Sequence, residues 1–233
     1  MEHTQTAATA SAPSNGPVVQ VDIISDIMCP WCIVGFKQLQ MALNQTGIGA
    51  QVRWHPFELN PDMVAEGENL LEHLQRKYGI TADESAQNRQ KMSETGASLG
   101  FTFNFSERSR IVNSFKAHLL LDFAATKGLQ HPLKMALFDA HFTDNRDVSD
   151  EATLLDVAVE TGLDRTEAIA ALASEAHAGA VRAQQKVWRD NGISGVPSMI
   201  FAETYLVTGA QGPQNYANIL QKVAQEAPVV QSV

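Results

Sequence analysis

The chain has 233 residues, of which 44% are hydrophobic and 18% are charged. This length suffices for one large domain or for one domain with an insertion, and the apolar content excludes global disorder. A formal net charge of −9 without any basic run argues against nucleic acid or an anionic membrane as partner, because both attract clustered positive charge.

The two ends of the chain are predicted to be disordered tails, over residues 1–17 and 228–233, because the first is rich in small and polar residues. The first of them lacks the apolar segment of a signal peptide, and no later stretch reaches the length of a membrane span. We therefore expect a cytoplasmic protein that does not enter the membrane.

The first predicted elements form a parallel crossover unit. An apolar run over 18–25 predicts a strand, and a helix follows from Cys29 to about Thr46, ended by glycines at 47 and 49. Alternating β-formers over 51–57 predict a second strand. Two parallel strands joined by a helix are a βαβ unit.

The middle of the chain is predicted to be helical, and strands return near its end. Pro197 opens a predicted hairpin over 197–207, and a closing helix covers 213–224. The fold class is therefore α/β, with a βαβ half over 18–61, an all-helical insertion over 62–178 and a ββα half over 179–227. The helices predicted in the middle cover 69–78, 81–99, 110–127, 132–142, 150–160, a segment opening at 164, and 175–189.

Both cysteines lie in Cys29-Pro30-Trp31-Cys32, at the predicted strand-to-helix junction. A C-x-x-C at this place is typical of a thioredoxin-like redox motif. Proline fits the first helical turn, and the positive end of the helix should lower the pKa of Cys29. Cys32, one turn further on, should be more buried. We expect Cys29 to attack a disulfide and Cys32 to resolve the mixed disulfide.

A second segment, around Val196-Pro197, is predicted to form part of the same site. A cis peptide bond here would leave the Val196 N–H and C=O free to pair with an extended substrate. Trp31 is expected to be exposed as a platform for an apolar substrate, with Met28 on the same rim. His55 and His118 are candidate contributors to the pocket, and His141 is interpreted as a helix-end residue.

A zinc site and inert buried thiols are the alternatives for the cysteine pair. Tetrahedral zinc needs four ligands, so His55 or His118 would have to complete the set, and no second C-x-x-C exists. We therefore expect no metal.

Several blocks, taken together in their order and spacing, make the chain similar to the DsbA family of the thioredoxin superfamily, in its FrnE-like branch. The resemblance implies a thioredoxin fold with an inserted helical domain, a cis-proline at Pro197 facing the cysteine pair, and the roles of Cys29 and Cys32 given above. The blocks are Ser25-Asp26 before the C-x-x-C, Trp54-His55-Pro56-Phe57-Glu58-Leu59-Asn60-Pro61, Asn113-Ser114-Phe115-Lys116-Ala117-His118, Ala140-His141-Phe142, Gly195-Val196-Pro197-Ser198 and Gly209-Ala210-Gln211.

The 2-hydroxychromene-2-carboxylate isomerases and kappa-class glutathione transferases resemble the chain in the same blocks. They use bound glutathione and generally carry serine at the position of Cys29, so cysteine there favours a redox enzyme. Because the segment Asn113–His118 resembles their pocket-lining helix, Asn113 and His118 are pocket candidates and glutathione is a candidate thiol partner. No other cofactor is expected. The second cysteine pair of some FrnE-like proteins is absent.

Three functions follow from the sequence. The leading hypothesis is a thiol–disulfide oxidoreductase acting on protein or low-molecular-weight disulfides. The first alternative is a glutathione-dependent isomerase or transferase, and the second is a non-catalytic, chaperone-like binding module. A homodimer is the default expectation for the assembly.

Overall fold

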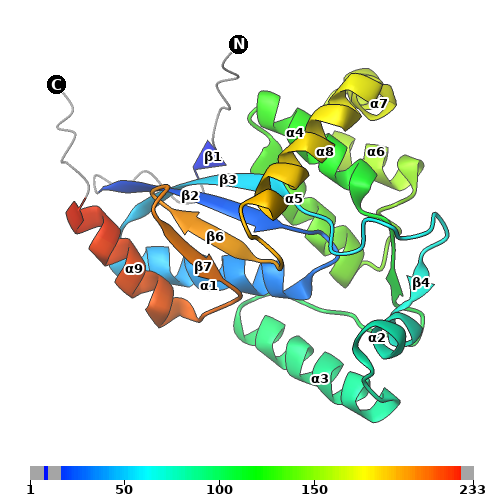
Figure 1. Cartoon of the computed structure of the whole chain (residues 1–233), viewed down its shortest axis with the longest axis horizontal. Helices are drawn as coiled ribbons and strands as arrows, with labels where there is room; N and C mark the ends of the chain where they lie inside the picture. Colours follow the sequence, from blue (N-terminus) through cyan, green and yellow to red (C-terminus); the bar gives the residue numbers. More distant parts are fainter. Residues whose placement is uncertain (1–7, 10–16, 227–233) are drawn as a thin grey trace.

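A computed structural model describes residues 8–9 and 17–226. Its centre is a five-stranded sheet whose second and third strands in space run parallel, while the other neighbours are antiparallel (Figure 1). The predicted α/β class with a helical insertion is confirmed. In spatial order the strands are β1 (Ala8–Thr9), β3 (Gly49–Pro56), β2 (Val18–Ser25), β6 (Ser198–Phe201) and β7 (Tyr205–Thr208).

β2 is the central strand, and from Val21 to its end every residue is buried. Its one carboxylate, Asp22, is paired across the sheet with Arg53 and His55, whose Nε and Nε2 atoms each lie 2.7 Å from Oδ1. Burial alone would raise the pKa of Asp22, but hydrogen bonds from His55 and Arg53 hold it well below its ordinary range. The His55 side chain is thus bonded to a carboxylate of the central strand.

α1 (Pro30–Thr46) and α9 (Pro213–Glu226) lie side by side against one face of the sheet (Figure 1). α1 starts with proline, which needs no helical N–H partner there. It ends at Gly47, whose φ of 68° is left-handed and whose N–H bonds to the carbonyl of Leu43. These two helices therefore fix the direction of the cysteine pair relative to the sheet.

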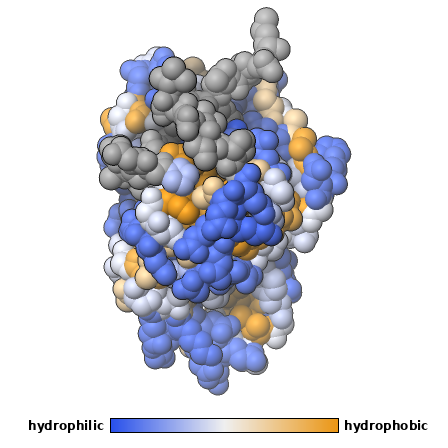
Figure 2. Space-filling view, turned by 90° about the vertical axis from the view of Figure 1, so that its left-hand side faces the viewer, coloured by the Kyte–Doolittle hydropathy of each residue, from blue (hydrophilic) through white to orange (hydrophobic). Residues whose placement is uncertain are grey.

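α9 buries only one stripe of side chains, with Tyr216, Leu220 and Val223 at helical spacing. Figure 2 views this end of the molecule, where hydrophilic residues dominate and the hydrophobic patches are small and separated. Among the residues that the structure describes, no helix is both long and apolar enough to cross a membrane.

The insertion is a group of helices beside the sheet, to the right in Figure 1. Several start at a side-chain cap, such as Thr81, which forms a capping box with Glu84. A short two-stranded ribbon, β4 (Glu68–Asn69) with β5 (Arg110–Ile111), closes one end. The helices are α2 (Leu70–Tyr78), α3 (Ala82–Ser98), α4 (Phe115–Thr126), α5 (Gln130–Phe138), α6 (Glu151–Glu160), α7 (Arg165–Ala173) and α8 (Glu175–Asp190).

Two helix predictions were wrong at their ends. The helix predicted from residue 110 begins only at Phe115, because Arg110 and Ile111 pair with β4 and the Asn113 side chain caps the Phe115 N–H at 2.9 Å. The helix predicted to reach residue 142 stops being α-helical at Phe138. It continues as a π-helical turn over Asp139–Thr143, and such turns often mark functional places.

The predicted domain limits do not all coincide with element ends. The limit at 178/179 lies inside α8, and the sheet resumes only at β6. In the predicted N-terminal tail, Ala8 and Thr9 pair with β3, and the rest of that tail up to residue 16 lies outside the described residues, as does 228–233. The division into halves and insertion stays a prediction.

Two helical glycines give a matched test of the packing of α3. A Cβ on Gly96 would lie 2.5 Å from the Phe103 ring and 2.7 Å from the Phe101 carbonyl, whereas one on Gly179 in α8 would meet nothing within 4 Å. Gly96→Ala should therefore lower the free energy of unfolding by about 1–3 kcal/mol. Gly179→Ala should raise it by about 0.5–1 kcal/mol through helix propensity. Urea denaturation measures both, and equal effects would contradict the close packing at Gly96.

Candidate active site

The two cysteines lie where β2 passes into α1, with Cys29 as the residue that caps the helix. Both are free thiols. Cys32 is 0% exposed and Cys29 is 4% exposed, in the order that the sequence predicted. The backbone N–H of Cys32 donates to the carbonyl of Cys29 at 3.0 Å, so the pair occupies one tight turn.

The Val196–Pro197 segment faces Cys29 from the start of β6. Its peptide bond is cis, and the Cys29 thiol donates to the Val196 carbonyl at 3.4 Å. Gly35 in α1 lets Pro197 approach, because a Cβ there would lie 3.1 Å from the proline ring. The structure therefore brings the Val196–Pro197 segment next to Cys29, as predicted. The Val196 carbonyl, which was expected to pair with a substrate strand, here accepts a hydrogen bond from the Cys29 thiol.

The lowered pKa expected for Cys29 is not found in the reduced pair. Hydrogen bonding with Cys32 raises the pKa of the Cys29 thiol well above its usual value, and burial and the charge of Asp26 add to this. Burial would also raise the pKa of Cys32, but the hydrogen bond from Cys29 and the Lys134 ammonium lower it. The backbone N–H of Cys32 acts on the Cys29 sulfur in the opposite direction and lowers this pKa, but it is outweighed by the other contributions.

Asp26, three residues before Cys29, is a carboxylate with no exposed surface. Its Oδ2 accepts the Leu59 N–H at 2.7 Å and its Oδ1 accepts the Met28 N–H at 3.2 Å. His118 Nε2 lies 3.5 Å from Oδ1, which is long for a hydrogen bond. Burial would raise the pKa of Asp26, but His118 and the Leu59 N–H hold it below its ordinary value.

Lys134 of α5 is a lysine only 1% exposed. Its Nζ lies 5.3 Å from the centre of the Trp54 ring and 4.9 Å from that of Phe138, in cation–π range. No carboxylate lies in ion-pair range of it within the described part of the chain. Burial lowers the pKa of Lys134 to about 8, against the attraction of Cys32. A cation thus approaches the buried sulfur from the insertion.

A cavity of about 610 Å³ opens between the C-x-x-C motif and the insertion. Met28, Cys29, Pro30 and Trp31 line it, and Trp31 is 49% exposed. The other pocket candidates lie elsewhere. His55 and His118 line a second, far smaller cavity, and the Asn113 amide binds the Met63 carbonyl at 3.2 Å.

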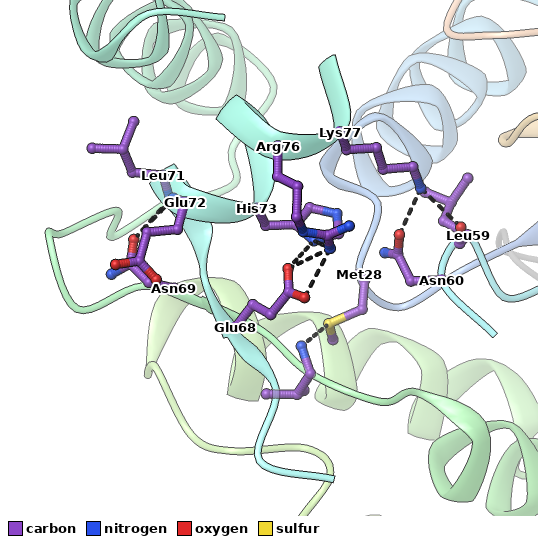
Figure 3. A network of polar contacts seen from close by, with 11 residues as sticks. Met28, Leu59, Asn60, Glu68, Asn69, Leu71, Glu72, His73, Arg76 and Lys77 are labelled. Carbon is purple, nitrogen blue, oxygen red and sulfur yellow. Dashed lines mark hydrogen bonds and ion pairs between the residues drawn. The ribbon is translucent and has the colours of Figure 1, made fainter. Parts of the chain in front are cut away.

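The wall opposite the motif is built by α2 (Figure 3). His73 and Arg76 of this helix both bind the Glu68 carboxylate at 2.7 Å. Lys77 reaches across to the Leu59 carbonyl at 3.0 Å. On the floor, the Met28 sulfur accepts the Val112 N–H at 3.4 Å. Helix α2 is therefore tied to the same turn that holds Asp26.

Several site residues escaped the sequence analysis. Asp26 carried a signal, because an acidic residue directly after an apolar strand is either a turn residue or a buried charge. Lys134 carried none, because only tertiary packing brings α5 under the motif. His141 was interpreted as a helix end, yet it lines the cavity, and burial lowers its pKa to about 4, so that its ring is neutral at neutral pH.

No group of three or more histidine, cysteine or acidic side chains is placed to hold a metal among residues 8–9 and 17–226. The two thiols, the buried carboxylate and the buried ammonium are therefore the reactive groups to explain.

Comparison with known proteins agrees with this geometry. The profile of the DSBA-like thioredoxin domain family matches residues 20–221. The chain belongs to this family. The resemblance found in the sequence is confirmed, and the FrnE-like branch is consistent with the solved structures that are similar.

Among curated proteins, the chain is 27% identical over 195 residues to the uncharacterized protein YwbO of Bacillus subtilis, covering 83% of this chain and 92% of that one. The crystal structure of the probable DsbA oxidoreductase SCO1869 from Streptomyces coelicolor is 29% identical, with a TM-score of 0.83 over 92% of this chain and 94% of that one.

Two more distant structures share the fold. A 2-hydroxychromene-2-carboxylate isomerase is 14% identical, with a TM-score of 0.65 over 89% of this chain and 97% of its own. The cytosolic disulfide reductase DsbM from Pseudomonas aeruginosa, solved with GSH, is 16% identical, with a TM-score of 0.60 over 88% of this chain and 99% of its own.

Replacing the buried Lys134 with an apolar residue should raise the free energy of unfolding and make the cysteine pair harder to deprotonate. Between pH of about 8 and 10.5 the unfolded chain binds more protons at Lys134 than the folded chain, so this group makes the free energy of unfolding rise with pH there. At about pH 7, Lys134→Met should therefore stabilise the protein by about 3 kcal/mol, a gain that vanishes above pH of about 10.5. It should also raise the first pKa of the dithiol.

Denaturation across this pH range and thiolate absorbance measure the two effects. Lys186→Met is the matched control, because Lys186 is exposed in α8 and pairs with Asp190, and it should change stability by less than about 0.5 kcal/mol. A destabilised Lys134→Met protein at about pH 7, with an unchanged thiol titration, would show that Lys134 does not act on the cysteines.

Proposed function

We propose that the protein is a thiol–disulfide oxidoreductase in which Cys29 exchanges with the substrate and Cys32 resolves the mixed disulfide. The observation that carries this assignment is access. Cys29 lines the large cavity, whereas Cys32 does not line it and is fully buried behind Cys29. A substrate sulfur that enters the cavity therefore meets Cys29 first, whichever thiol has the lower pKa.

The reductive direction proceeds in two exchanges. The Cys29 thiolate attacks one sulfur of a disulfide R–S–S–R, which forms Cys29–S–S–R and releases one R–S⁻. The Cys32 thiolate then attacks the Cys29 sulfur, which closes the Cys29–Cys32 disulfide and releases the second R–S⁻. Two electrons pass to the substrate, and the two thiol protons go to solvent or to the released thiolates. The oxidative direction is the reverse.

The buried charges around the pair support these steps. The proximity of the two sulfurs raises the pKa of Cys29 and lowers that of Cys32, so the first proton leaves Cys32, and transfer of the Cys29 proton to Cys32 then exposes the attacking thiolate. The Lys134 ammonium stabilises that first negative charge, and the Asp26 carboxylate opposes a second one. The pair therefore carries one charge at a time, as sequential attack requires.

A glutathione-dependent isomerase or transferase is the second candidate. Its support is the shared fold of the isomerase and of DsbM, which was solved with GSH, and the cavity at Cys29. Cysteine rather than serine at position 29 favours the redox reaction, with protein or low-molecular-weight thiols as partners. The cytoplasmic location and the homodimer stay predictions.

Cysteine variants test the order of the two sulfurs. Cys32→Ser should accumulate a mixed disulfide with the substrate at Cys29, because no thiol is left to resolve it. Cys29→Ser should lose disulfide-reducing activity by about a hundredfold or more, because the remaining sulfur lies out of reach. Insulin reduction and intact-protein mass spectrometry measure these results.

The same experiment separates the two candidates. A glutathione-dependent isomerase should keep its activity on an electrophile after Cys32→Ala. Undiminished insulin reduction by Cys29→Ser would reject the proposed oxidoreductase mechanism.

A further inference from the structure

The charge of the large cavity is opposite to that of the protein. The chain has 17 Lys and Arg against 26 Asp and Glu. The cavity wall instead carries five cations and one carboxylate, Asp147. An acidic protein that concentrates positive charge in one cavity raises the local concentration of anions there. The cations are Arg89, Lys91, Arg108, Arg110 and Arg146.

Most of these cations have no carboxylate partner. Arg146 is 3.3 Å from Glu160, but within the described residues no acidic group lies in ion-pair range of the other four. Arg89 donates to the Ser106 carbonyl at 3.3 Å, and Arg110 donates to the Glu66 carbonyl. Arg89 and Arg110 thus donate to neutral carbonyl groups, which do not neutralise their positive charge at the cavity.

One buried polar group on the same wall also lacks a partner. Ser85 is fully buried and lines the cavity, and its hydroxyl has no hydrogen-bond partner among the described residues. His73 of α2 also lines the cavity, and its Nδ1 is used by Glu68. Since buried polar groups are normally satisfied, the free hydroxyl of Ser85 indicates that a ligand group belongs beside it.

The positions of these groups along α3 explain how they share one wall. Ser85, Arg89 and Met92 recur at a spacing of three or four residues, which is one face of a helix. The lining also contains apolar side chains, with Phe105 and Phe142 among them. The cavity therefore combines the Cys29 sulfur, apolar side chains, and cations and hydroxyl groups that come from the segment between β3 and α8.

We propose that this cavity binds a low-molecular-weight organic disulfide with an apolar body and negatively charged end groups, and that Arg108 and Arg110 select it by charge. This inference rests on the proposed oxidoreductase function and specifies its substrate class. One sulfur of the ligand reaches Cys29 while its anionic end lies toward the insertion. A volume of about 610 Å³ suits a small molecule of this kind.

Two disulfides of similar size but different charge test the proposal. Dithiobis(nitrobenzoate) carries a carboxylate on each ring, whereas dipyridyl disulfide is neutral. The second-order rate of reaction with the reduced protein is measured for each by stopped flow. The double variant Arg108→Gln/Arg110→Gln should react about tenfold more slowly with the anionic disulfide and within about twofold of wild type with the neutral one.

Both arginines are exposed, so the double variant should fold as the wild type does. Arg165→Gln is the matched control, because Arg165 lies on α7 and pairs with Asp156, outside the cavity wall. It should leave both rates unchanged. Ser85→Ala should raise the concentration of the anionic disulfide that gives half the maximal rate, and it should leave the reaction with the neutral disulfide unchanged.

The outcomes separate the two claims. Equal losses with both disulfides, or no loss with either, would overturn the charge selection while leaving the oxidoreductase function in place. A reduced wild-type protein that reacts with neither disulfide and forms no Cys29–Cys32 disulfide would instead remove the proposed function itself.

Discussion

The buried carboxylate of Asp26 is the constraint on which the rest of the site depends. It accepts backbone N–H groups from Met28 and from Leu59, so it fixes the turn before Cys29 and the exit of β3 at the same time. Lys77 of α2 donates to the Leu59 carbonyl and so ties α2 to the segment that follows β3. A charge without exposed surface is tolerated only when it is satisfied in this way. The position of Cys29 is therefore set by electrostatics as well as by packing.

The cysteine pair has a buried cation on one side and the cavity on another. Lys134 lies under the motif between aromatic rings, where an ammonium is costly to bury, and its field favours one thiolate. The cavity reaches only Cys29. Lys134 of α5 thus helps to lower the pKa of the buried Cys32 thiol, while α2 and α3 contribute residues to the wall of the cavity that reaches Cys29.

The sequence predicted most of the sheet and the cysteine pair, because continuous apolar runs, Gly and Pro stops and a C-x-x-C are local signals. It did not predict Lys134 or Ser85, since nothing near these residues in sequence shows that α5 and α3 turn them toward the motif. It misjudged the pKa of Cys29, because the hydrogen bond with Cys32, burial and the charge of Asp26 outweigh the effect of the helix end, and none of these three can be read from the local sequence. His55 looked like a site residue but is held by Asp22.

The central claim is that Cys29 and Cys32 act as one redox unit. The most direct measurement is alkylation and intact-mass analysis of the protein across mixtures of reduced and oxidised dithiothreitol. If the two cysteines form one two-electron couple, only unmodified and doubly alkylated chains should be found, and they should interconvert at a single midpoint. Predominantly singly alkylated chains, or two thiols that stay reduced in every mixture, would contradict it.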